Sequence, residues 1–118
     1  MKNFRLAAAA VVVVALVVLS FRTTSSTASA VPPVPCTTSA LGQAFHGQFH
    51  LSSIQNYGCE DEWAYVWATV GSGEEAIGVT EVLAFTTASQ RWHIVSRATD
   101  CKASILPRVV YRQGCFSN

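Results

Sequence analysis

The clearest pattern of hydrophobic and polar positions is an alternation over residues 63–70. Successive side chains of a strand point to opposite faces, so the alternation predicts a strand with two different faces. One face has the aromatic row, Trp63, Tyr65 and Trp67. The other face has the small row, Ala64, Val66, Ala68 and Val70. We expect a strand over residues 59–70 that starts at Cys59 and organises the domain.

A helical spacing of apolar residues comes before this strand. The apolar positions recur at intervals of three and four residues and comprise Leu41, Ala44, Phe45 and Phe49. Such positions share one helix face, and Thr37 or Thr38 can cap the start of the helix. We expect residues 51–57 to connect the helix to the strand, with room for a short strand over 51–54.

Two further strands and a second helix follow. Residues 77–86 and 92–98 have strand character, and the short polar link between them predicts an antiparallel hairpin. Pro107 suits the first position of a helix, and Gly114 suits its end. The sequence therefore predicts an α+β domain: an N-terminal helix, a three-stranded antiparallel meander and a C-terminal helix.

The first thirty residues are typical of a secretory signal peptide. Lys2 and Arg5 precede an apolar run over residues 6–19, and Ala28-Ser29-Ala30 forms a small-x-small cleavage pattern. The run is shorter than the roughly 20 residues of a transmembrane helix, although an uncleaved anchor is the alternative. We expect a signal peptide over 1–30, an extended proline-containing leader over 31–35 and one domain over 36–118, without a membrane span after cleavage.

Removal of the signal changes the net charge. The whole chain has a net charge of +1, whereas residues 31–118 hold five basic and seven acidic residues, a net charge of −2. A protein that binds the nucleic-acid backbone is expected to have a positive net charge or a dense basic stripe. The exported composition therefore disfavours a nucleic-acid partner.

All four cysteines, Cys36, Cys59, Cys101 and Cys115, lie after the predicted cleavage site. An even number of cysteines in a short exported chain predicts two disulfides. Zinc is the competing interpretation, but no two cysteines have the close spacing of structural zinc sites.

The predicted topology favours one disulfide pairing. In a three-stranded meander flanked by two helices, Cys36 and Cys101 would lie at one end of the sheet, and Cys59 and Cys115 at the other. We therefore expect the bonds Cys36–Cys101 and Cys59–Cys115. The alternative pairs Cys36 with Cys59 and Cys101 with Cys115, and in this layout each bond would have to span on the order of 12 to 18 Å.

We expect both helices to lie on one side of the sheet, against the small row, which would leave the aromatic row on the open face. Arg91, His93 and Arg97 would lie beside that row and create an aromatic and cationic surface. Such a surface binds ligands by stacking and cation-π contacts, or binds a partner protein. Two alternatives remain: the arginine stems simply cover the rings, or the faces are reversed and the tryptophans are buried.

Only one enzymatic constellation can be assembled from the sequence. Glu81, His93 and Arg97 could project from one sheet face and act on a phosphodiester, as in a small secreted ribonuclease. The signal is weak, because polar residues are the usual content of the open face of an antiparallel sheet.

Metal and cofactor signals are weaker still. His46 and His50 have the spacing of zinc-ligating histidines on a helix, but no glutamate lies between them and Gly47 weakens the helix there. The acidic triplet at residues 60–62 would project to alternate sides of a strand, which disfavours calcium. We expect no metal site and no cofactor.

The spacing of residues across the exported part has a loose resemblance to known proteins. It reads Cys59-x3-Trp63-Ala64-x-Val66-x-Ala68, then Arg91-Trp92-x-Ile94-Val95 before Cys101, then Leu106-Pro107 and Cys115. This arrangement resembles small secreted proteins and extracellular modules of high-GC Gram-positive bacteria. The resemblance implies an extracellular or envelope setting and assigns no activity. Trp67 and the acidic triplet that starts at Glu60 depart from it.

Taken together, the patterns predict a secreted, non-enzymatic domain. Its expected partner is a protein or a cell-envelope component, bound through Trp63, Tyr65 and Trp67. The alternative function is a small secreted hydrolase that uses Glu81, His93 and Arg97.

Overall fold

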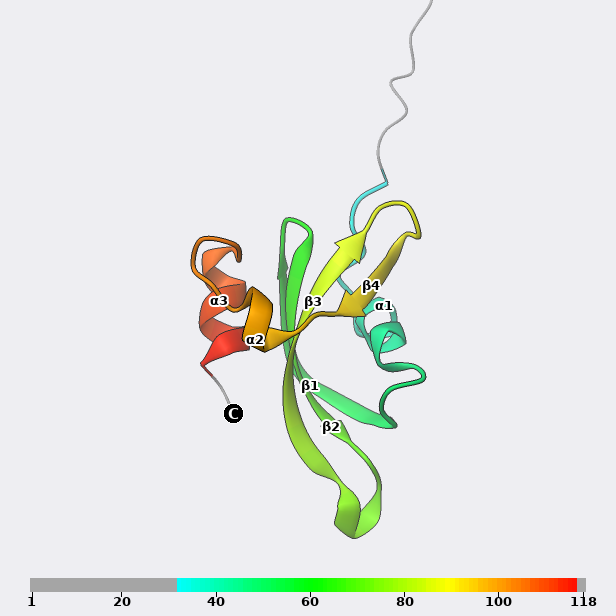
Figure 1. Cartoon of the computed structure of the whole chain (residues 1–118). Helices are drawn as coiled ribbons and strands as arrows, with labels where there is room; N and C mark the ends of the chain where they lie inside the picture. The colour runs from blue at the N-terminus through cyan, green and yellow to red at the C-terminus, as the bar shows by residue number, and fades with distance from the viewer. Residues whose placement is uncertain (1–31, 117–118) are drawn as a thin grey trace, which may run out of the picture. The chain divides into compact units, whose positions relative to one another are not determined.

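A four-stranded antiparallel sheet forms the centre of the protein (Figure 1). The computed structural model describes residues 32–116, and the predicted signal peptide lies outside them. The strands follow one another in the order β1 (Leu51–Glu60), β2 (Trp63–Val70), β3 (Ile77–Thr86) and β4 (Arg91–Ile94). The helical segments are α1 (Thr38–Gly42), η1 (Gln43–Phe45), η2 (Gly73–Glu75), α2 (Arg97–Asp100) and α3 (Arg108–Cys115). The α+β class and the antiparallel meander are confirmed, with four strands in place of three.

The additional strand is β1, which lies at an edge of the sheet. Cys59 lies near its end, and Glu60 pairs with Trp63 across a tight turn in which Asp61 has φ 55°. The expected strand over residues 59–70 is therefore a hairpin turn followed by β2. The register of β1 shifts between Leu51 and Ser53 and again between Ile54 and Asn56. Such bulges interrupt the period of two, which is why the sequence shows little strand signal here.

The N-terminal helical segment is shorter than its apolar spacing predicts. Thr37 caps α1 as expected, since its side-chain oxygen accepts a hydrogen bond of 3.1 Å from the backbone N–H of Ala40. The chain then tightens into η1, and His46 leaves the helical conformation with φ −60° and ψ 131°. Gly47 follows with φ 81°, a conformation that glycine adopts without steric cost.

The small row of β2 faces this N-terminal segment, as predicted. Leu41 and Phe45 are fully buried at 0% exposure and pack with the small row in the larger core cluster. The strands β3 and β4 contribute Leu83, Phe85 and Trp92 to the same cluster. Trp92 also donates a hydrogen bond of 2.7 Å from Nε1 to the carbonyl of Pro35, which holds the leader against the domain.

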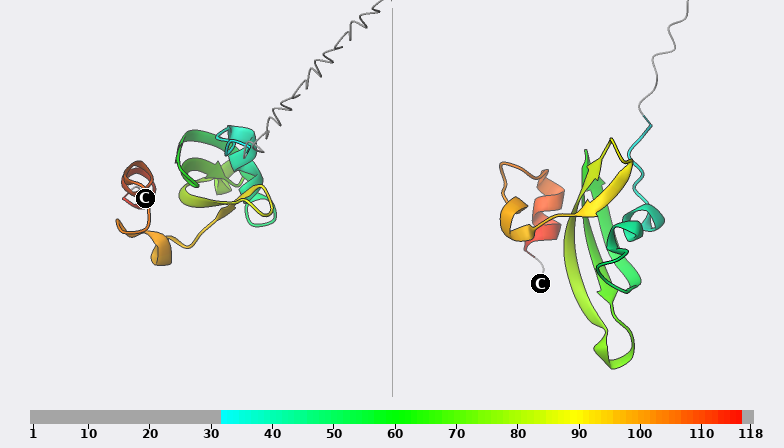
Figure 2. Two further views of the ribbon diagram at one scale, coloured as in Figure 1. Left: turned by 90° about the horizontal axis from the view of Figure 1, so that it is seen from above. Right: turned by 45° about the vertical axis from the view of Figure 1, so that its right-hand side comes forward.

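The C-terminal helix covers the opposite face of the sheet (Figure 2). Val110 of α3 and Leu106 just before it are buried against Tyr65 and Val82. The expectation that both helices share one side is therefore wrong. Leu106 and Val110 form an apolar stripe that has to be covered, and the aromatic row is the face that remains for it.

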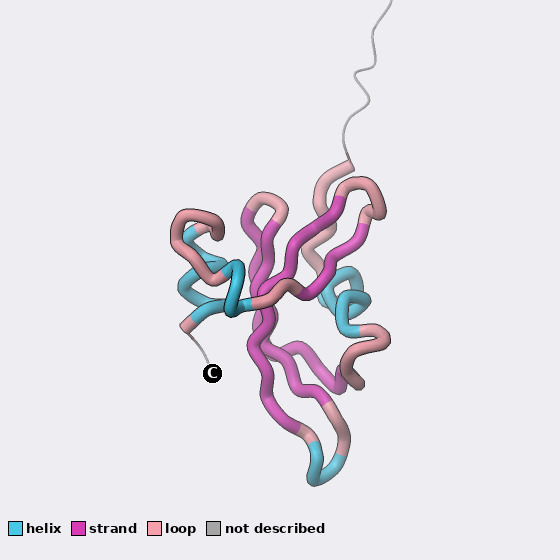
Figure 3. Tube along the Cα trace, in the orientation of Figure 1, coloured by secondary structure: helices cyan, strands magenta, loops and turns pink. Residues whose placement is uncertain are grey.

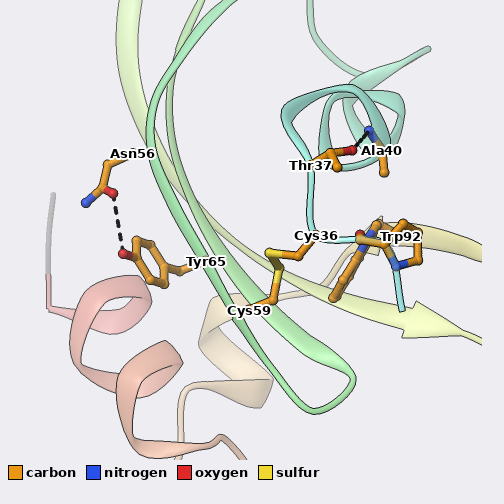
Figure 4. Close-up of a disulfide and its surroundings, with 8 residues drawn as sticks. Cys36, Thr37, Ala40, Asn56, Cys59, Tyr65 and Trp92 are labelled. Atoms are coloured by element: carbon orange, nitrogen blue, oxygen red, sulfur yellow. Dashed lines mark hydrogen bonds between the residues drawn. A yellow bond between two sulfur atoms is a disulfide. The ribbon is translucent and has the colours of Figure 1, made fainter. Parts of the chain in front are cut away.

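The two disulfides are present, but their preferred pairing is wrong. Cys36 is bonded to Cys59 (Figure 4), and Cys101 is bonded to Cys115. Because β1 runs antiparallel to β2, the chain reverses once more than expected before the aromatic row. This extra reversal places the N-terminal segment at the end of the sheet where Cys59 lies.

The second bond closes because the chain turns back on itself between α2 and α3. Residues 101–107 run along the length of α3 before the helix begins, and the helix then returns to α2 (Figures 1 and 3). The Cα atoms of Cys101 and Cys115 are consequently only 5.6 Å apart.

Across residues 32–116, no helix has the length and apolar content needed to cross a membrane.

Peptide mapping under non-reducing conditions should recover Cys36 linked to Cys59 and Cys101 linked to Cys115. Replacing both Cys101 and Cys115 by serine removes the bond between two residues that are 14 positions apart in the sequence. Loop-closure entropy predicts a decrease of about 3 kcal/mol in the free energy of unfolding, measured by urea denaturation. A mapped peptide that links Cys36 to Cys101 would contradict this topology.

Gly114 tests the close contact of α3 with the sheet. A Cβ atom at this position would lie 2.7 Å from Cγ2 of Val82, and Val82 is itself buried. We expect Gly114→Ala to lower the free energy of unfolding by about 1 to 3 kcal/mol. Alanine normally stabilises a helix relative to glycine by roughly 1 kcal/mol, so a stabilised variant would show that α3 does not pack as described. Gly78→Ala is the matched control, since a Cβ atom at Gly78 would meet nothing within 4 Å.

Candidate functional site

The predicted aromatic surface lies under α3. Tyr65 is 7% exposed, and Trp63 and Trp67 are half-buried against the same cluster. Trp67 donates a hydrogen bond of 2.8 Å from Nε1 to the backbone carbonyl of Gln113 in α3. The hydroxyl of Tyr65 faces Oδ1 of Asn56 at 3.5 Å (Figure 4). These rings form the platform on which α3 docks, and the expectation that they form an open stacking surface is wrong.

The three expected cationic partners of that surface do not gather either. Arg91 and His93 are exposed on β4, and Nδ1 of His93 lies 3.1 Å from Oγ1 of Thr86. Arg97 starts α2 and donates a hydrogen bond of 3.3 Å from Nη2 to the carbonyl of Cys115. Arg97 therefore helps to hold α2 against the end of α3.

The hydrolase constellation is not assembled. His93 is paired with Ala84 across β3 and β4, so these two residues share a sheet face. Glu81 lies three residues before Ala84 on β3, which places it on the opposite face and roughly 10 Å along the strand. Burial raises the pKa of Glu81, and the positive charge of Arg97 offsets part of this increase.

The histidine pair does not have the helical geometry of a zinc site. Since the chain becomes extended at His46, His50 is not one helical turn further along the same face. Among residues 32–116, no group of three or more histidine, cysteine, aspartate or glutamate side chains is placed to hold a metal ion.

One hollow of the described domain lies where the chain reverses after η1. It has a volume of about 630 Å³ and lies between the N-terminal helical segment and the start of β1. Its polar lining comprises Thr38, Ser39, Gln43, His46 and His50. Its apolar lining includes Phe49, which is 41% exposed and whose ring centroid lies 6.4 Å from that of Phe45. Ligand pockets fall in the range of roughly 300 to 1,000 Å³.

A second hollow adjoins the first. It has a volume of about 350 Å³ and is lined by Gln43, His46, Arg91 and Trp92. Gln43 and His46 line both hollows, and we refer to the two together as the histidine groove.

The histidine and arginine side chains of the histidine groove are exposed and have no partner within the described part of the chain. The side chains of His46, His50 and Arg91 make no hydrogen bond or ion pair with another of residues 32–116. No carboxylate is present among the residues that line either hollow. The groove is thus rich in hydrogen-bonding side chains and includes one guanidinium, that of Arg91.

A third hollow lies beside α3 and has a different composition. Its volume is about 360 Å³, and its lining includes Arg108, Arg112 and Gln113 together with the carboxylate residue Glu60. Two arginines one helical turn apart make this surface basic, but Glu60 offsets part of that charge.

The sequence pattern singles out His46 and His50 as a weak candidate for a metal site, but it does not predict the groove. The signal that was available is Gly47 between the two histidines, because a glycine after an apolar stripe indicates where a helix stops. Arg91 was expected to belong to the aromatic surface, and the structure places it at the groove instead.

Comparison with known protein families, curated proteins and solved structures finds no match. The resemblance to secreted proteins of high-GC Gram-positive bacteria stays a prediction.

The raised pKa of Glu81 predicts how stability depends on pH. Glu81 binds a proton more tightly in the folded protein than in the unfolded chain, where its value is 4.5. Stability from this group is therefore greatest at low pH and decreases as the pH rises through the folded pKa. Glu81→Gln, which stays neutral, should melt at a higher temperature than the wild type at pH 7, and the difference should vanish below pH 4.5.

Glu74→Gln is the matched control, because Glu74 is exposed in η2. If Glu81→Gln instead melted below the wild type at pH 7, with the deficit vanishing on acidification, the Arg97 attraction would outweigh the burial of Glu81, and the assignment would be wrong.

Proposed function

We propose that this protein is an exported, non-catalytic binding domain that recognises an extracellular or envelope component through the histidine groove. The observation that supports this most is the groove itself. It is large enough for a ligand, and its histidine and arginine side chains have no partner among the described residues. Ligand sites are concave and combine apolar side chains with a small number of polar groups that orient the ligand.

Export is supported by the signal-like N-terminus and by the cysteines. Both disulfides are formed, and the described residues contain no free cysteine. Disulfides of this kind persist in oxidising compartments such as the extracellular space. They therefore fit a protein that works outside the cytosol.

A binding role fits the geometry better than a hydrolytic role. The nucleophile, base and charge stabiliser of a hydrolase have to converge on one point. Glu81 and His93 face opposite sides of the sheet, and Arg97 is used at the end of α3. The histidine groove has imidazoles but no carboxylate among its lining residues that could orient one of them as a base.

The groove is held by a rigid frame, which favours binding because little ordering is needed. The bond between Cys36 and Cys59 ties the start of the N-terminal segment to β1. Phe45 anchors η1 in the core, and the backbone N–H of Gly71 donates a hydrogen bond of 2.8 Å to the carbonyl of His50. Both ends of the loop that contains Gly47 are consequently fixed.

Loss of the groove should abolish capture of the partner. The wild type and the double variant Phe49→Ala, His50→Ala would each be immobilised and exposed to envelope material of the producing cell. We expect the variant to capture at least tenfold less of the envelope component that the wild type captures. A tenfold loss corresponds to about 1.4 kcal/mol, within the range for one buried aromatic contact and one hydrogen bond. Both residues are exposed, so the fold should be retained, which thermal unfolding would verify.

The double variant Val109→Ala, Arg112→Ala is the matched control, because it removes one exposed apolar and one polar side chain from α3. Equal capture by the groove variant and the wild type would refute the proposed function. So would selective loss in the α3 variant, since binding would then occur on the other side of the sheet.

A further inference from the structure

The smaller hollow of the histidine groove has the composition of an anion site. Its lining combines the guanidinium of Arg91, the imidazole of His46 and the amide of Gln43. Arginine presents parallel N–H donors that match both oxygens of a carboxylate or phosphate, and a second donor alongside adds selectivity. The volume of about 350 Å³ is ample for one such group.

Trp92 closes this hollow without competing for the anion. Its Nε1 already donates to the carbonyl of Pro35, and its ring is buried in an edge contact with Phe85, with the ring centroids 5.3 Å apart. The available donors at this end are therefore those of Arg91, His46 and Gln43.

The larger hollow offers a different chemistry. Thr38 and Ser39 present hydroxyl groups, His50 presents an imidazole, and Phe49 presents an exposed aromatic ring. Hydroxyl, amide and imidazole groups exchange hydrogen bonds with the hydroxyls of a ligand, and an aromatic ring packs against its C–H surface. This end suits an uncharged, hydroxyl-rich body.

The position of the guanidinium indicates which end takes the charge. Neither hollow has a carboxylate among its lining residues, but only the smaller one has an arginine, Arg91. Glu74 and Glu75 lie in the loop that follows Gly71, whose N–H is bonded to the carbonyl of His50 at the other end of the groove. The charge of an acidic ligand is therefore favoured beside Arg91.

We infer that the histidine groove binds an acidic carbohydrate-like ligand, with a phosphate or carboxylate at Arg91 and His46 and a hydroxyl-rich body against Phe49. This inference rests on the proposed function and specifies the chemical class of its ligand. The hollow beside α3 is less suited to the same ligand, because Glu60 is among its lining residues.

The test titrates the oxidised protein with glucose 6-phosphate, glucuronate or glucose. Binding is measured by NMR as changes in the amide chemical shifts. We expect glucose 6-phosphate, glucuronate or both to shift the amides around Gln43, His46 and Arg91 at concentrations where glucose does not. A response to glucose 6-phosphate alone assigns the site to phosphate, and a response to glucuronate alone assigns it to carboxylate.

Arg91→Gln should weaken binding of the responding acid by about tenfold, since a charge-assisted hydrogen bond contributes roughly 1.5 to 3 kcal/mol. Arg108→Gln, which removes a guanidinium from the hollow beside α3, should leave the affinity unchanged. Three results would overturn the inference: an equal response to glucose, an affinity unaffected by Arg91→Gln, or shifts centred on α3.

The two proposals fail separately. If the Phe49, His50 double variant loses its envelope partner while neither acid perturbs the groove, the binding function stands and the acidic ligand is wrong. If capture does not depend on the groove at all, the proposed function is wrong, whatever the probes show.

Discussion

Both faces of one narrow sheet have to be kept from water, and the rest of the molecule follows from this constraint. β2 has buried side chains on each side, with Ala64 and Val66 facing one way and Tyr65 the other. A single helical layer would leave one of these faces wet, at a cost of about 25 cal/mol for each Å² of apolar surface. The chain meets the requirement by using its two ends, with α1 and η1 on one face and α3 on the other. The N-terminal cover is tied to β1 by the Cys36–Cys59 bond, and the Cys101–Cys115 bond joins the end of α2 to the end of α3. These cross-links add to the modest core that a domain of this size can bury.

The alternation over residues 63–70 was sufficient to predict β2 and to predict that helical structure covers the small row, although only the N-terminal helical segment does so. It was not sufficient to predict what lies over the aromatic row. A period of two shows that two faces differ, but a partly apolar face can be open or covered with the same local pattern. The aromatic row is covered because Leu106 and Val110, far along the chain, are themselves buried against it. The missed strand has a local cause, because two register shifts in β1 disturb the alternation that would have revealed it. Because the predicted topology lacked β1, it placed Cys36 at the wrong end of the sheet. The predicted disulfide pairing was wrong for the same reason.

The histidine groove was harder to predict than the fold. His46 and His50 share a helix face if the helical segment continues for one more turn, and they flank a chain reversal if it ends at η1, as it does here. Arg91 reaches the groove from a strand that is 45 positions away in sequence from His46, through the contact of β4 with η1. Local sequence patterns do not encode such proximity. They do indicate the chemical types involved, since imidazole, guanidinium and an exposed aromatic ring are all visible in the sequence.

The order of the disulfides has a consequence for how the chain matures. Cys36 and Cys59 are the first two cysteines and Cys101 and Cys115 the last two, so the rings they close are consecutive and do not interlace. When a chain crosses a membrane N-terminus first, oxidising each pair of thiols in order of emergence produces the native bonds directly. An interlaced pairing would instead require early bonds to be broken by thiol–disulfide exchange, a slow step that needs an isomerase. For this protein, an oxidase that joins successive cysteines is chemically sufficient, and each face of the sheet receives its cover from a segment that is cross-linked independently of the other.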